Sequence, residues 1–114
     1  MVAESIQRVV REYLRAATRA GIPARRAVVF GSQAKGHAHA LSDIDIVVLS
    51  PALEPPRSHA LIATLWRLRI QTDSRIEPIP CGEKEWDTDD SRAILEIARR
   101  EGTLIEGTEA DTGQ

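Results

Sequence analysis

Two aspartates one residue apart stand at the start of an apolar segment in the middle of the chain. Residues 28–49 read VVFGSQAKGHAHALSDIDIVVL and contain Asp43 and Asp45 around the start of the run Ile44–Leu49. Side chains two positions apart in a strand point to the same face, so both carboxylates are expected to point away from the core. Two carboxylates about 5 Å apart repel by roughly 3 kcal/mol at an effective dielectric constant near 20, and a divalent cation reverses that interaction.

Two interpretations of this pair remain open. In the first, the carboxylates share Mg²⁺ with phosphate oxygens and water, which is the usual set of magnesium ligands. In the second, Asp43 caps a turn and Asp45 lies in solvent at the start of the strand. Gly31 and Ser32 favour the first, because they directly follow the apolar run Ala27–Phe30. A glycine there lets an anion approach the backbone, and the amides of a following helical turn can hold phosphate. Alone, this Gly-Ser pair would indicate only a tight turn.

A third acidic residue lies in a later apolar segment. The stretch SRIEPIP places Glu77 among isoleucines and prolines in an expected strand over residues 74–80. If this strand pairs beside the one that contains Asp45, Glu77 completes a triad suited to two metal ions and phosphoryl chemistry. The alternative is an exposed glutamate at the edge of a sheet.

Hydrophobic periodicity supplies the elements that must position these residues. The pattern predicts a helix over residues 4–20, a helical turn over 32–36 and a helix over 58–71 whose apolar side includes Trp66. An acidic loop over 82–90 then leads to a helix over 91–100, capped by Asp89 or Asp90, and a short strand over 103–106. This order predicts an α/β (α+β) fold with a small mixed sheet of three to four strands and helices packed mainly on one face.

Composition indicates an ordinary globular protein. The chain has 114 residues, 42% hydrophobic and 28% charged, which suits a single domain over residues 1–106 with a frayed tail over 107–114. One cysteine, Cys81, excludes an internal disulfide and suits the cytoplasm. We expect no signal peptide and no membrane span. Residues 1–42 carry seven Lys or Arg against two Asp or Glu, and residues 76–114 carry four against eleven, so a polyanionic ligand or a charged partner is conceivable.

The stretch FGSQAKGHAHALSDIDIVV resembles the signature of the DNA polymerase beta-like nucleotidyltransferase superfamily, which is an apolar strand, Gly-Ser, about ten residues and Asp-x-Asp. The step Ala34-Lys35-Gly36 is similar to the minimal nucleotidyltransferase (MNT) branch, whose members often act as antitoxins beside a helical HEPN toxin. The resemblance covers residues 1–106. It implies a polymerase beta-like nucleotidyltransferase fold.

The resemblance also implies roles for individual residues. Gly31, Ser32 and Lys35 would bind the phosphates of ATP or another nucleoside triphosphate. The catalytic and metal-binding residues would be Asp43, Asp45 and Glu77, which would hold two Mg²⁺ ions, with Glu77 helping to deprotonate an acceptor hydroxyl. Lys35 stands where the branch more often has arginine, which keeps the charge but loses the bidentate geometry.

The resemblance therefore implies a nucleotidyltransferase that transfers AMP to a hydroxyl and releases pyrophosphate. The acceptor stays open between a partner protein, an RNA end and a small molecule, and a homodimer or a HEPN-type partner would supply the other wall of the cleft. The alternative is a binding module that neutralises its partner with weak or no catalysis. His37 and His39, in the loop between Gly-Ser and the aspartates, either bind metal or phosphate or lie exposed.

Overall fold

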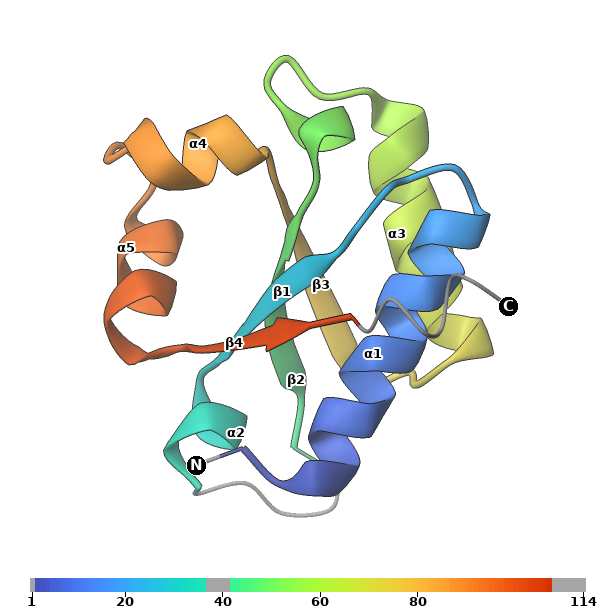
Figure 1. The fold of residues 1–114 in the computed structure, drawn as a ribbon, viewed down its shortest axis with the longest axis vertical. Coiled ribbons are helices and arrows are strands. Elements are labelled where there is room, and N and C mark those ends of the chain that lie inside the picture. The colour runs from blue at the N-terminus through green and yellow to red at the C-terminus, as the bar shows by residue number, and fades with distance from the viewer. Residues whose placement is uncertain (1, 37–41, 108–114) are drawn as a thin grey trace.

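The computed structural model describes residues 2–36 and 42–107, in which a four-stranded mixed sheet lies between two layers of helices (Figure 1). The strands are β1 (Arg26–Phe30), β2 (Ile44–Leu49), β3 (Ile76–Cys81) and β4 (Thr103–Glu106), in the order β3-β2-β1-β4. Strand β1 is antiparallel to β2 and β4, and β2 is parallel to β3. The predicted α/β class and small mixed sheet are confirmed, and β3 occupies an edge, as its prolines predicted.

Helices α1 (Glu4–Arg19) and α3 (His59–Gln71) cover one face of the sheet (Figure 1). The larger buried cluster joins Leu14 of α1 and Leu65 of α3 to Ile44 and Ile46 of the sheet. A buried hydrogen bond also links the two helices, since the hydroxyl of Tyr13 donates to the carbonyl of Leu65 at 2.7 Å. Burial raises the pKa of Tyr13, which keeps this donor protonated.

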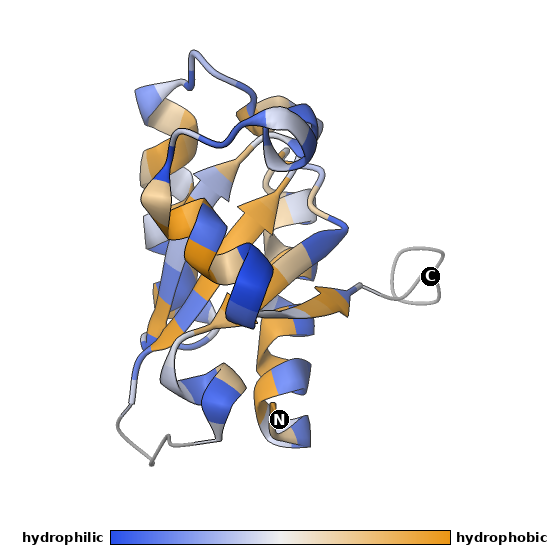
Figure 2. Ribbon diagram, turned by 90° about the vertical axis from the view of Figure 1, so that its left-hand side faces the viewer, coloured by the Kyte–Doolittle hydropathy of each residue, from blue (hydrophilic) through white to orange (hydrophobic). Residues whose placement is uncertain are grey.

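Helices α4 (Glu83–Thr88) and α5 (Ala93–Glu101) lie on the opposite face. A second buried cluster there joins Phe30, Val47 and Cys81 of the sheet to Leu95 and Ala98 of α5. The expectation that helices pack mainly on one face therefore holds for the two longest helices, while α4 and α5 cover the other. Figure 2 shows that the strands consist mostly of apolar residues, whereas apolar and polar residues are mixed in the helices.

The expected loop over residues 82–90 contains α4, so that prediction is wrong. The carboxylate of Glu54 accepts hydrogen bonds from the backbone amides of Lys84, at 2.7 Å, and Glu85, at 3.2 Å, which satisfies the first turn of the helix. The side-chain cap predicted for the next helix is also wrong. Helix α5 begins at Ala93 without a side-chain cap, and Asp89 bonds to Ser91 instead.

A partly buried ion network fixes α4 and α5 against the segment after β2. The carboxylate of Glu85 accepts from Arg57 at 2.6 Å and from Arg92 at 2.9 Å. Burial alone would raise the pKa of Glu85, but the hydrogen bonds from Arg92, the Gly82 amide and Arg57 outweigh it and hold that pKa below its usual value. Within the described ranges, no helix has the length and apolar character needed to cross a bilayer.

Candidate active site

The strand register brings two of the predicted acidic residues side by side. Asp45 of β2 is the parallel partner of Glu77 of β3 and the antiparallel partner of Phe30 of β1. Both carboxylates project from the face that α4 and α5 cover, because Ile44 and Ile46 point into the cluster under α1 and α3. Asp43, two residues before Asp45, precedes the first residue of β2.

The three carboxyl groups influence one another. Burial raises the pKa of Asp45, the negative charge of Asp43 raises it further, and the hydrogen bond with Glu77 opposes both. Burial likewise raises the pKa of Glu77, as do the charge of Asp43, a hydrogen bond to Asp43 and the charge of Asp45, while Arg69 lowers it. Burial and the negative charge of Asp43 thus raise the pKa of both Asp45 and Glu77, and a cation beside these two carboxyl groups would favour their charged forms.

Gly31 lies against the carboxylate of Asp45. Its backbone has φ 73° and ψ −150°, a conformation that residues with a side chain rarely adopt. A Cβ atom at this position would stand 2.5 Å from Oδ2 of Asp45. Directly after Gly31 comes α2 (Ser32–Lys35), a single turn that ends at Gly36 in the left-handed region. The helical turn predicted after the Gly-Ser pair is present, and it begins beside Asp45.

A buried glutamine, which sequence reasoning missed, ties α2 to the start of β2. Gln33 is 6% exposed, and its Nε2 donates to the carbonyl of Asp43 at 3.3 Å and to that of Ser42 at 3.5 Å. These bonds fix the backbone at the aspartate pair relative to the Gly-Ser turn. A polar residue inside the helical turn that follows β1 was the signal available in the sequence.

Lys35 forms an ion pair with a carboxylate of α5. Its Nζ atom lies 3.3 Å from Oε1 of Glu101 at the end of α5. The ion pair is half-exposed, so it is worth little in stability and can open. The loop histidines His37 and His39 lie outside the described residues.

The donor set suits magnesium, although the side chains do not form a ready-made cage. The carboxyl groups of Asp43, Asp45 and Glu77 are hard oxygen ligands of the kind that Mg²⁺ requires. Burial raises the pKa of Asp45 and of Glu77, and Gly31 beside Asp45 leaves room for an anion. As the side chains lie, no group of three His, Cys, Asp or Glu residues in ranges 2–36 and 42–107 is arranged to hold an ion.

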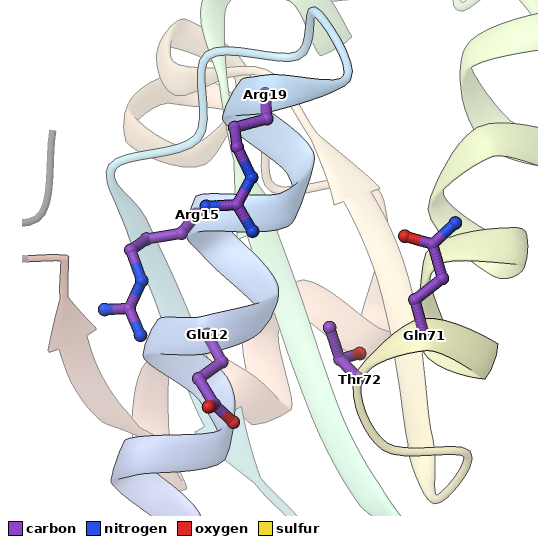
Figure 3. Close-up of a pocket in the computed structure, with 5 residues that line it drawn as sticks. All are labelled: Glu12, Arg15, Arg19, Gln71 and Thr72. Atoms are coloured by element: carbon purple, nitrogen blue, oxygen red, sulfur yellow. The ribbon is translucent and has the colours of Figure 1, made fainter.

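A polar groove of about 470 Å³ lies elsewhere, between α1 and α3 (Figure 3). Because α1 and α3 cover the face opposite the carboxylates, this groove is separate from the site. The residues that line it are Glu12, Arg15, Arg19, Gln71 and Thr72.

A family model described as the nucleotidyltransferase domain matches residues 10–101, a range that includes the Gly-Ser turn and all three carboxylates. No curated protein matches the chain significantly.

Several solved structures share the fold. A toxin–antitoxin crystallised with AMP-PNP is 23% identical, with a TM-score of 0.61 over 94% of this chain and 77% of that one. A protein from Sulfolobus solfataricus that is described as a nucleotidyltransferase is 18% identical, with a TM-score of 0.60 over 86% of this chain and 77% of that one. A complex from Shewanella oneidensis, of a tri-AMPylated HEPN toxin with its MNT antitoxin, is 20% identical, with a TM-score of 0.54 over 94% and 77%. These likenesses extend over most of each chain.

Proposed function

The chain belongs to the nucleotidyltransferase domain family, and from that premise we propose that it is a Mg²⁺-dependent enzyme that transfers AMP from ATP to a hydroxyl of a partner protein. The observation that carries the proposal is the meeting of Asp45, Glu77 and Gly31 at one end of the sheet. Strand pairing holds Asp45 beside Glu77. Because Gly31 has no side chain, nothing stands between the Asp45 carboxylate and an approaching phosphate at that position.

The carboxylates have a direct role in this proposal. Asp43, Asp45 and Glu77 would hold two Mg²⁺ ions, which supply positive charge to the triphosphate and the attacking oxygen. Glu77, the parallel partner of Asp45, would help to accept the proton of the acceptor hydroxyl. The acceptor oxygen forms a bond to the α-phosphorus, the bond from that phosphorus to the bridging oxygen breaks, and pyrophosphate leaves.

Gly31 and Ser32 would receive the outer phosphates at the start of α2. The amides at the beginning of a helical turn point out of it and can donate to phosphate oxygens. Lys35 would reach the triphosphate after releasing Glu101, an exchange that the half-exposed ion pair permits.

A HEPN-type protein is the proposed acceptor. The support is the Shewanella oneidensis complex, which shares the fold of this chain and pairs an AMPylated HEPN toxin with an MNT antitoxin. ATP and a reduced, buried Cys81 fit the cytoplasm as the compartment.

The experiment combines ATP labelled at the α-phosphate, Mg²⁺, the purified chain and the protein encoded by the neighbouring reading frame. We expect label on that protein and none after the double change Asp43→Asn and Asp45→Asn. The matched control is Asp87→Asn with Asp90→Asn, which removes the same charge from two exposed residues beyond the site and should leave transfer intact. Label that survives the first double variant, or label on added RNA in place of protein, would contradict the proposal.

A further inference from the structure

Helix α3 carries apolar side chains on two sides, although the described part of the chain covers only one. Leu65 and Leu68 are buried against the sheet, whereas Trp66 is 40% and Ile70 81% exposed. Trp66 was expected in the core, so that prediction is wrong. Together with Ile62, these two exposed residues follow the i, i+4, i+8 spacing and form a continuous ridge along the helix, the α3 stripe.

The α3 stripe is unlike the outward side of α1, the neighbouring helix. Surface helices ordinarily present polar residues to solvent, and a large exposed apolar patch indicates a surface that becomes covered. Helix α1 follows this rule, since its buried positions are apolar and its exposed positions are Glu4, Ser5, Arg8, Glu12, Thr18 and Arg19. Because α1 packs on the same face of the sheet with a polar outer side, the exposed apolar residues of α3 are not needed for the fold itself.

The α3 stripe belongs to the helix beside β3, the edge strand that contains Glu77, although α3 covers the face opposite to the Glu77 carboxylate. Only residues 72–75 separate α3 from β3, and Glu77 is the second residue of that strand. Helix α1 contacts β1 and β4, whereas α3 contacts β3 at the edge of the sheet. Gln71 and Thr72 line the groove between α1 and α3 (Figure 3). At about 100° per residue, Trp66 and Ile62 lie roughly 140° and 180° around the helix from Gln71, so most of the α3 stripe points away from α1.

Charge indicates what kind of surface would cover the α3 stripe. Helix α3 contains Arg67 and Arg69 and no acidic residue. The guanidinium of Arg69 stacks over the ring of Trp66, with its Cζ atom 4.9 Å from the ring centroid, which holds positive charge beside the apolar ridge. A second copy docked through the same face would bring arginines near arginines, so a partner with carboxylates around an apolar centre fits better.

We propose that the α3 stripe is the docking surface for the acceptor protein, which meets Ile62, Trp66 and Ile70 with an apolar patch and the flanking arginines with carboxylates. Docking there holds the acceptor at the sheet edge that contains Glu77, and so raises the concentration of its hydroxyl at the carboxylates. The inference rests on the proposed function in taking a protein as the acceptor.

The test compares two variants of the α3 stripe with a matched control. Trp66→Ala and Ile70→Glu change exposed side chains, so the fold should survive, and thermal unfolding verifies that it does. Leu104→Glu introduces the same charge as the second variant at a residue that is 48% exposed on β4, the opposite edge of the sheet. The binding partner in the assay is the protein of the neighbouring reading frame, and its Kd is measured by calorimetry.

We expect each α3 variant to raise the Kd at least about thirtyfold, as at a hot-spot residue, and the Leu104 control to change it less than about threefold. Binding of Mg²⁺-ATP should be the same in all four proteins, since the α3 stripe is not part of the carboxylate site.

Several results would overturn the inference. Equal affinity of the α3 variants and the control, no binding by the wild type, or a wild-type homodimer that Ile70→Glu dissociates would each do so. Failure of the proposed function looks different. If the wild type binds the partner through the α3 stripe but transfers no label, the docking surface is confirmed and the proposed nucleotidyl transfer is wrong. If the α3 variants transfer label as efficiently as the wild type, the proposed nucleotidyl transfer is confirmed and this docking surface is wrong.

Discussion

Replacing Gly31 by alanine should disturb the carboxylate site through a single added atom. The new Cβ would stand 2.5 Å from Oδ2 of Asp45, closer than any real contact, so the carboxylate must turn away. The backbone at φ 73° and ψ −150° adds about 1–3 kcal/mol of strain for a residue with a side chain. A displaced rotamer of Asp45 adds about 1 kcal/mol. We therefore expect the free energy of unfolding to fall by about 2–4 kcal/mol.

Gly21→Ala separates the two contributions. Gly21 also has a positive φ, of 98°, but a Cβ there would meet nothing within 4 Å. The control therefore carries backbone strain without a clash, and the stabilising effect of alanine on the unfolded chain is common to both changes. Urea unfolding should show the larger loss for Gly31→Ala. Calorimetry should show Mg²⁺-ATP binding lost in Gly31→Ala and retained in Gly21→Ala.

A double-mutant cycle isolates the contact itself. In an Asp45→Ala background the carboxylate is gone, and the remaining Cβ at position 45 lies at an ordinary 3.8 Å from the added atom. Gly31→Ala should then be less destabilising by about 1 kcal/mol than it is in the wild type. A coupling free energy of zero, or intact nucleotide binding by Gly31→Ala, would refute the idea that Gly31 is required by its approach to Asp45.

Two further changes test the charges in the structure. Asp45→Asn should raise the free energy of unfolding of the metal-free protein by about 1 kcal/mol, because it removes a carboxylate whose pKa is raised by burial and by Asp43. We also expect Mg²⁺-ATP to raise the Tm of the wild type and not that of this variant. A drop in metal-free stability would contradict the first expectation. Glu85→Gln should lower the free energy of unfolding by about 3 kcal/mol at pH 7, because Arg57 and Arg92 lose their shared partner. Since the folded-state pKa of Glu85 is lowered, this contribution is complete above the ordinary pKa of 4.5 and is lost as the pH falls through the folded value, so urea midpoints of wild type and variant should converge in acid.

The elements that hold the site could be predicted because their signals are local. The alternation around Asp45, the glycine before Ser32 and the prolines of β3 each restrict the backbone within a few residues. Glu77 was expected beside Asp45 only on the condition that their two strands pair, and the register shows that they do. Whether these residues bind metal and nucleotide remains a prediction.

What could not be predicted depends on contacts between distant segments. Helix α4 is stabilised at its start by Glu54, about 30 residues earlier in the chain, so its acidic sequence alone resembled a loop. The partner of Lys35 is Glu101, at the far end of the described chain. Trp66 was misplaced because α3 is apolar on two sides, and periodicity does not tell which side meets the sheet.

The prolines of β3 also decide how another chain can meet this edge of the sheet. The carbonyls of Arg75 and Cys81 accept hydrogen bonds from the amides of Ile44 and Ser50, at the two ends of β2. The odd-numbered residues of β3 therefore direct their backbone groups toward β2, and the even-numbered residues direct theirs toward the open edge of the sheet. Of these, Pro78 and Pro80 have no amide hydrogen, and the amide of Ile76 already donates to Asp73. The outer edge of this described strand therefore offers no donor to an incoming strand. The molecule is protected there from edge-to-edge aggregation, and any protein that approaches Glu77 must be recognised by side chains, not by extension of the sheet.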